Sequence, residues 1–270
     1  MCYDAESGTK LALKYAQHRG DEGTVKALTR QLELFRMDFP AYYHVSGFVH
    51  PPLMVFTNQQ PLVPQAFIWG LIPAWSKNAV EAKKLWHNTL NARAESIFEK
   101  PAFKQSAIHK RCIIYLDAFY EHRHLNKKKI PYRITMNDQS PMAIAGLWEE
   151  WQDKTSGEKL QTVSIVTTEA NALMQKIHNN AGAEGPRMPV ILPKEKQDEW
   201  LIDCHNQTDE EHLKSLLIPF DENALTAYPV AKLRGKEAIG NTIEVEKEVK
   251  YAEIENEQHK GKQFNLFDET

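Results

Sequence analysis

The sequence has few cysteines, few glycines and no long hydrophobic run. Its three cysteines, Cys2, Cys112 and Cys204, form no Cys-x-x-Cys pair, which argues against a disulfide framework and favours a reducing compartment. No apolar stretch approaches the roughly 20 residues of a membrane-spanning helix, and the residues after Met1 are too polar for a signal peptide. We therefore expect a cytoplasmic protein with no membrane partner.

An excess of positive charge is also missing, because the formal net charge is −3. This argues against a generally basic nucleic-acid-binding protein and restricts any DNA contact to a local patch. The His and Cys positions do not recur at zinc-like spacing, and the 12 glycines form no phosphate-binding loop. We expect neither a metal nor a cofactor.

The chain is long enough, at 270 residues and 42% hydrophobic composition, to bury one large core. Patterning predicts an α+β single domain with a strongly curved, mainly antiparallel, barrel-like sheet flanked by helices. Residues 1–250 form this domain, and residues 251–270 are expected to be a mobile tail. The predicted helices are 9–19, 21–35, 79–90, 168–178, 194–201 and 208–217, and the predicted strands are 42–45, 53–57, 112–120, 131–136, 142–151 and 160–167.

Cys2 follows Met1 directly. Removal of Met1 would give this residue two nucleophiles on adjacent carbons, an α-amine with a reference pKa of about 8 and a thiol with one of about 8.5. Such a pair condenses with an aldehyde to an imine and then closes to a five-membered thiazolidine. It also suits an N-terminal nucleophile in acyl transfer, so the residue alone leaves both chemistries open.

Six segments, in a fixed order, resemble a known family. From Cys2 to about Val230, the chain is similar to the SOS response-associated peptidase (SRAP) family. The segments are Phe67–Trp75, Asn91–Ser96, Arg111–Glu121, Ala145–Glu149, Thr167–Asn171 and Ile177–Leu192. Any one of them can arise by chance, but the ordered set is hard to obtain that way.

The resemblance implies recognition of abasic sites in single-stranded DNA and covalent capture of their aldehyde by Cys2. It assigns proton transfer to Glu121 and His178, and it makes Asn91 an orienting amide for the Cys2 amine. Each residue also has a purely structural interpretation. Glu121 would mark the solvent boundary of a strand, and His178 would complement a helix dipole.

Several residues are predicted to contact DNA. Arg93 and Arg187 supply charge for phosphates, and Trp69 and Trp75 supply rings for base stacking, although tryptophans are as often core residues. The triplet Lys127, Lys128 and Lys129 adds a basic cluster that is equally consistent with a solvated loop.

Two departures from the family pattern stand beside the expected nucleophile. The family usually begins Cys-Gly-Arg, whereas this chain has Tyr3 and Asp4 after Cys2. The missing arginine removes an expected phosphate contact, and we expect Asp4 to repel the same phosphate. In addition, residues 179–186 separate His178 from Arg187, so the insertion is expected to loop out or to displace His178.

The last residues contain a second motif. Gln263, Leu266 and Phe267 follow a polar linker and resemble the peptide that binds the bacterial sliding clamp, with Leu-Phe entering a hydrophobic pocket. Docking of these side chains on the same domain is the alternative.

The sequence therefore favours a DNA repair protein, associated with the nucleoid, that forms a thiazolidine crosslink and can cleave its own Met1–Cys2 bond. Two other functions remain open. One is a cysteine-type processing peptidase with Glu121 or His178 as base, and the other is a non-covalent single-stranded-DNA-binding module.

Overall fold

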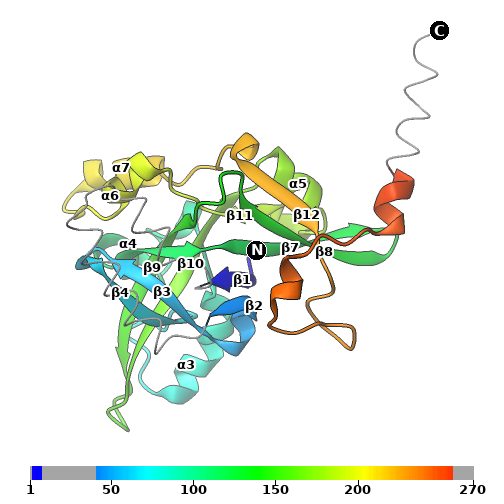
Figure 1. Ribbon diagram of the computed structural model, residues 1–270. Coiled ribbons are helices and arrows are strands. Elements are labelled where there is room, and N and C mark those ends of the chain that lie inside the picture. Colours follow the sequence, from blue (N-terminus) through cyan, green and yellow to red (C-terminus); the bar gives the residue numbers. More distant parts are fainter. Residues whose placement is uncertain (1, 8–40, 258–270) are drawn as a thin grey trace.

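Strands form most of the fold (Figure 1). The computed structural model describes residues 2–7 and 41–257, and the predicted helices 9–19 and 21–35 lie outside these ranges. The strands make two sheets, one of seven strands and one of five. Within the described residues, none of the helices combines the length and the apolar character of a membrane span.

The larger sheet closes into a barrel. Its strands pair in the order β10, β4, β3, β6 and β9, and β9 then returns to pair with β10. All pairings in this ring are antiparallel except the parallel contact of β10 with β4. The strands are β3 (Pro52–Thr57), β4 (Gln60–Trp69), β6 (Arg111–Leu116), β9 (Met142–Gln152) and β10 (Lys159–Glu169), and the short strands β5 (Asn91–Arg93) and β11 (Arg187–Pro189) also pair with β10. The α+β fold with a barrel-like sheet is confirmed.

The second sheet carries the N-terminal strand in its interior. Its order is β12-β8-β7-β1-β2, with antiparallel neighbours throughout. The strands are β1 (Asp4–Ser7), β2 (Tyr42–Ser46), β7 (Ala118–Leu125), β8 (Lys128–Met136) and β12 (Leu225–Pro229). The single strand predicted over 112–120 is wrong, because the chain leaves the barrel at Asp117, whose N–H donates to Glu6.

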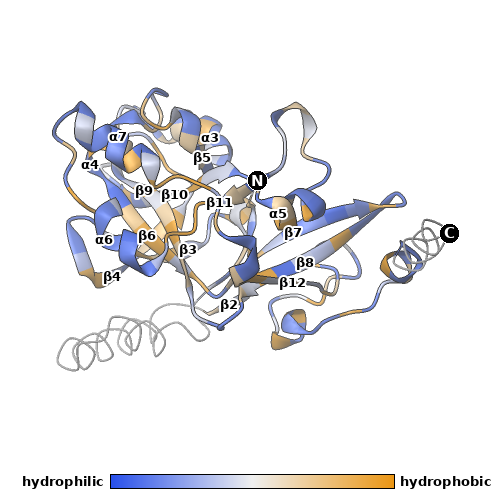
Figure 2. Ribbon diagram, turned by 90° about the horizontal axis from the view of Figure 1, so that it is seen from above, coloured by the Kyte–Doolittle hydropathy of each residue, from blue (hydrophilic) through white to orange (hydrophobic). Residues whose placement is uncertain are grey.

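Alternation along the barrel strands builds two hydrophobic clusters. Successive side chains of a strand point to opposite faces, so Ile113 packs into one cluster and Ile114 into the other. The first cluster lies under α4, α6 and α7, whose outer faces are hydrophilic in Figure 2. The α-helices are α3 (Ala79–Trp86), α4 (Lys104–His109), α5 (Ala172–Ile177), α6 (Gln197–Trp200) and α7 (Gln207–Ser215). Short 3-10 turns cover Gly47–Val49, His87–Thr89, Ala94–Ser96, Gly182–Glu184, Lys194–Lys196, Glu222–Ala224 and Ile243–Glu246.

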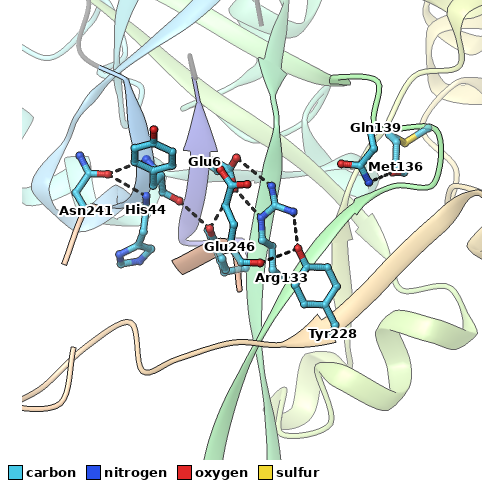
Figure 3. Close-up of polar contacts among 10 residues, drawn as sticks. Glu6, His44, Arg133, Met136, Gln139, Tyr228, Asn241 and Glu246 are labelled. Carbon is cyan, nitrogen blue, oxygen red and sulfur yellow. Dashed lines mark hydrogen bonds and ion pairs between the residues drawn. The ribbon is translucent and has the colours of Figure 1, made fainter. Parts of the chain in front are cut away.

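Residues 230–257 return along the five-stranded sheet, and we call this segment the strap. The side-chain oxygen of Asn241 accepts hydrogen bonds from the N–H groups of Tyr43 and His44 on β2, at 2.7 and 3.2 Å (Figure 3). Further along, residues 252–257 are helical beside the tip of the β7–β8 hairpin (Figure 1), and Tyr251 donates to the carbonyl of Val230 at 2.7 Å. A mobile tail starting at residue 251 is therefore wrong for residues 251–257, because their apolar side chains pack on the core.

Candidate functional site

Cys2 lies immediately before β1 and is only 1% exposed. The register of β1 against β7 pairs Asp4 with Tyr120, which directs Cys2 towards the part of β7 that carries Glu121. Burial and the nearby Glu121 carboxylate raise the pKa of the Cys2 thiol well above its usual value. The thiol therefore remains protonated at neutral pH.

Asn91, the first residue of β5, holds the backbone of Cys2. Its Nδ2 donates a hydrogen bond of 2.8 Å to the Cys2 carbonyl. Its Oδ1 is buried and has no hydrogen-bond partner among the described residues. A buried acceptor of this kind is costly unless a donor reaches it. The amide of Asn91 is therefore suited to accept from a group attached to Cys2.

Glu121 and His178 form a pair beside Cys2. His178 is at the C-terminal end of α5, and its Nδ1 lies 3.8 Å from a carboxylate oxygen of Glu121. Burial lowers the pKa of His178, and the Glu121 charge offsets part of this effect. The backbone N–H of Arg187 donates to Nδ1 at 3.1 Å. The carbonyl of Arg187 lies 3.2 Å from the same Nδ1, so the ring accepts from the Arg187 N–H in one tautomer and donates to the Arg187 carbonyl in the other.

The insertion 179–186 does not displace His178. The Arg187 N–H stays in contact with the His178 ring, because residues 179–186 loop outward between them. Both ends of this loop are attached to the site. The side chain of Asn179 exchanges two hydrogen bonds of 2.8 Å with the backbone of His124 on β7, and Glu184 forms an ion pair with Arg93 on β5.

Two cavities of about 240 Å³ each lie on either side of Tyr3, which lines both. The first cavity contains the Glu121–His178 pair, and the second contains Asn91. The other residues of the first are Asp4, Tyr120, His122, His124, Lys129, Asn180 and Arg234, and the other residues of the second are His87, Asn88, Arg93, Lys100 and Phe103. Three of the predicted catalytic residues, Asn91, Glu121 and His178, thus line the two cavities, and the fourth, Cys2, is buried next to Tyr3.

Asp4 does not present an unpaired negative charge. Its side chain is buried, His44 lies 2.9 Å from one carboxylate oxygen, and Arg234 Nη2 lies 2.8 Å from both. Burial by itself would raise the pKa of Asp4, but the bonds from His44 and Arg234 lower it below its usual value. The negative charge on which the expected repulsion of a phosphate depends is therefore paired, and the exposed Arg234 adds a positive charge beside it.

The two predicted stacking residues differ in position. Trp69 is fully buried, its ring lies under Gly47, and its indole N–H donates to Leu90 at 2.8 Å. It is a core residue, so the prediction of a stacking surface at Trp69 is wrong. Trp75 is 52% exposed and donates to the carbonyl of Pro101, the neighbour of Lys100 in the second cavity.

The predicted basic residues also lie in different parts of the structure. Arg93 lines the second cavity and Lys129 the first, whereas Lys127 is at the tip of the β7–β8 hairpin and Lys128 pairs with Glu253. The sequence predicts a DNA contact for Arg187, but the structure buries its side chain, with Nη2 on Glu95 at 2.8 Å. Only its backbone contacts the predicted catalytic residues, with the N–H at 3.1 Å from His178 Nδ1.

Sequence reasoning missed Tyr3 as a wall of both cavities, together with its ring partner Phe48 at 4.9 Å, which is 42% exposed. It also missed Arg234. The signal for Arg234 was the basic stretch 232–236, Lys-Leu-Arg-Gly-Lys, which nothing in the sequence links to Asp4. Among the described residues, no three His, Cys, Asp or Glu side chains gather as a metal site would require. Gln263, Leu266 and Phe267 lie outside the described residues.

Known proteins resemble this chain in sequence and in fold. The chain is 43% identical over 166 residues to the abasic site processing protein YoqW of Bacillus subtilis, covering 61% of this chain and 68% of that protein. It is 29% identical over 184 residues to the abasic site processing protein HMCES of Xenopus tropicalis, covering 62% and 52%. A crystal structure from Bacteroides thetaiotaomicron superposes with a TM-score of 0.76 at 32% identity, over 92% of this chain and 100% of that one. Residues 14–236 match the SOS response associated peptidases, and the chain belongs to this SRAP family.

Proposed function

We propose that this protein recognises abasic sites in single-stranded DNA and captures their ring-opened aldehyde through Cys2, after removal of Met1. The observation that carries the proposal is the placement of Cys2, whose carbonyl is held by Asn91 beside the Glu121–His178 pair. Relatives named as abasic site processing proteins support the same substrate. An aldehyde is the functional group for which a vicinal amine and thiol are suited.

The first covalent step uses the amine. Because burial keeps the thiol protonated, the α-amine is the group with a free electron pair near neutral pH. Its nitrogen attacks C1′ of the aldehyde, and Oδ1 of Asn91, which has no partner among the described residues, accepts an N–H from it. Glu121 carries one proton from the nitrogen to the aldehyde oxygen, which becomes a hydroxyl, and then carries the second nitrogen proton to this hydroxyl, which leaves as water. An imine remains.

The second step uses the sulfur. The Sγ atom adds to the imine carbon, the thiol proton passes to the imine nitrogen through Glu121, and a thiazolidine ring forms without further loss of atoms. His178 lies beside Glu121 and is available to protonate the O4′ or C1′ oxygen of the sugar. Both steps need only groups of this chain and the aldehyde.

The surroundings of Cys2 suit a single strand rather than a flat duplex. The two cavities flanking Tyr3 give a path on each side of the nucleophile. Phe48 exposes its ring beside Tyr3, and aromatic rings stack on unpaired bases. Arg93 and Lys129 place a positive charge in each cavity for the flanking phosphates.

A peptidase reaction at Cys2 is less well supported. A thiolate is the species that attacks a peptide carbonyl, and burial together with the Glu121 charge disfavours that form. Capture of an aldehyde by the amine does not require the thiolate at the first step.

Intact mass spectrometry tests the proposal. Protein lacking Met1 is mixed with single-stranded DNA containing an abasic site, and we expect an adduct equal to the two masses minus one water. Cys2→Ala keeps the amine but cannot close the ring, so its adduct should survive only after reduction with borohydride. DNA with a tetrahydrofuran in place of the abasic sugar has no aldehyde and should bind without an adduct. The absence of an adduct with the Met1-free protein would overturn the proposal.

A further inference from the structure

A third cavity, of about 420 Å³, opens between the β7–β8 hairpin and the start of the strap. We call it the strap groove. Its lining is rich in basic side chains, which come from two parts of the chain about 100 positions apart. The lining residues are His122, Lys129, Pro131, Lys232, Leu233, Arg234, Gly235, Lys236 and Glu237.

The strap groove is continuous with the first cavity beside Cys2. The two share His122, Lys129 and Arg234 as lining residues. Arg234 therefore lies at the junction, with one side towards the Glu121–His178 pair and the other towards Lys236. A chain that leaves the first cavity on this side enters the strap groove.

The wall made by the strap is held in place by contacts with the five-stranded sheet, on β8 and at the end of β2. Val230 donates to the carbonyl of Pro131 at 2.9 Å, and Lys232 Nζ donates to the carbonyl of Lys129 at 2.6 Å. Arg234 Nη2 also contacts Ser46 Oγ at 3.0 Å, and its guanidinium lies 5.7 Å from the ring centre of Phe48. The groove is thus a preformed surface rather than a loose loop.

The charge of the groove is strongly one-sided. Lys129, Lys232, Arg234 and Lys236 face it, against the single carboxylate of Glu237. Asp4, which borders the junction, is already bonded to Arg234 and His44. Burial and the neighbouring charge of Lys129 lower the pKa of His122 to about 4, so this ring adds no charge at pH 7. A polyanion is the ligand that such a groove would bind.

We propose that the strap groove binds the backbone phosphates of the DNA strand on one side of the abasic nucleotide, with Arg234 contacting the phosphate nearest to Cys2. This inference rests on the proposed function, since the abasic nucleotide occupies the first cavity. The family usually has an arginine where this chain has Asp4. Arg234 would supply the same guanidinium from a position 230 residues further along the chain. Asp4 acts as a positioning residue, because its bonds to Nη2 fix where the guanidinium lies.

The test compares three oligonucleotides that carry a tetrahydrofuran analogue, so that no covalent step contributes. One has short flanks, one is extended on the 5′ side, and one is extended on the 3′ side. Fluorescence anisotropy should show tighter binding for one extension only. The double variant Lys232→Gln/Lys236→Gln should lose about tenfold in affinity for that oligonucleotide and keep its affinity for the short one. The slope of log K against log salt should fall by about 1.4, as two lost single-strand phosphate contacts require.

The matched control is Lys154→Gln/Lys159→Gln, which removes two exposed lysines of the β9–β10 hairpin and should leave all three affinities unchanged. Lys236→Gln alone, at an exposed position, should show half of the change in slope if the double variant is destabilised. Equal losses for the short and extended oligonucleotides, or no loss for either, would overturn the inference. Failure of the crosslinking experiment would instead overturn the proposed function, because the anisotropy measurement needs no adduct.

Discussion

The side-chain amide of Asn91 donates to the backbone carbonyl of Cys2 at 2.8 Å, across 89 positions of sequence. This contact connects the barrel, through β5 and its partner β10, to the N-terminal residue that precedes β1 in the other sheet. It fixes the backbone of the proposed nucleophile.

We expect Asn91→Ala to reduce the rate of crosslinking about tenfold, because losing a buried hydrogen bond of roughly 1.4 kcal/mol corresponds to that factor. Asn91→Asp should be worse, since a carboxylate facing the Cys2 carbonyl can only repel it. Single-turnover crosslinking at saturating protein measures the effect. Asn223→Ala, an exposed asparagine far from Cys2, is the control. Wild-type rates in Asn91→Ala would show that the amide does not orient the nucleophile.

Glu6 and Arg133 form a buried ion pair on β1 and β8, and Arg133 also donates to Tyr228 (Figure 3). Arg133→Met would leave the Glu6 carboxylate buried and uncompensated, which we expect to lower the free energy of unfolding by about 3–5 kcal/mol. The double variant Glu6→Gln/Arg133→Met should recover part of this loss. Urea unfolding followed by tryptophan fluorescence measures both. A single variant as stable as wild type would contradict the importance of the pair.

Stability should decrease from pH 7 to pH 5. The pKa of His122 is lowered by burial from 6.5 to about 4, and the pKa of His178 is also below 6.5 in the folded state. The unfolded chain therefore binds more protons in this window, so the stabilisation is complete above pH 6.5 and is lost as the pH falls towards 4. For His122 we expect a loss of about 1 kcal/mol after allowing for its partial exposure.

Urea midpoints at pH 7 and pH 5 check this expectation. His122→Gln should lose less stability than wild type over the same interval. Equal pH dependence in the two proteins would show that His122 is protonated as readily in the folded chain as in the unfolded one.

Glu184, from the insertion after His178, pairs with Arg93 at the second cavity. A DNA phosphate that binds Arg93 must displace this carboxylate. Glu184→Gln should therefore strengthen binding of single-stranded DNA about two- to fivefold, the range expected for an exposed pair. Anisotropy with the tetrahydrofuran oligonucleotide measures the affinity, and Glu158→Gln, which removes a distant exposed charge, should have no effect. Weaker binding by Glu184→Gln would mean that Glu184 orders Arg93 for DNA rather than competing with it.

Local patterns were sufficient to predict much of the fold. Their content of β-branched and aromatic residues placed the strands around Ile134, Ile144 and Ile165 close to their observed positions, and both faces of these strands are largely buried. The break at Asp117 was missed because both flanking segments are equally buried, so the pattern carries no sign that they belong to different sheets.

Residues of the candidate site could be predicted only where they belong to a short sequence motif. Cys2, Glu121 and His178 were identified from short segments, whereas Arg234 depends on an ion pair across 230 positions that no local pattern encodes. Trp69 was placed wrongly for a related reason. The sequence around Gly70 does not distinguish an aromatic ring that faces a nucleotide from one that faces the barrel interior. The closed barrel of the structure shows that the ring of Trp69 is buried.

Burial of Cys2 limits the time during which an aminopeptidase could remove Met1. An aminopeptidase must draw the N-terminus into its own active site, which the folded chain prevents because Cys2 is 1% exposed. The partner strand β7 starts at residue 118, and ribosomes need about 6–24 s to make roughly that many residues at 5–20 residues per second. Met1 is open to other enzymes during this interval. Once β1 pairs with β7, local unfolding must precede the approach of any enzyme to the backbone of Cys2.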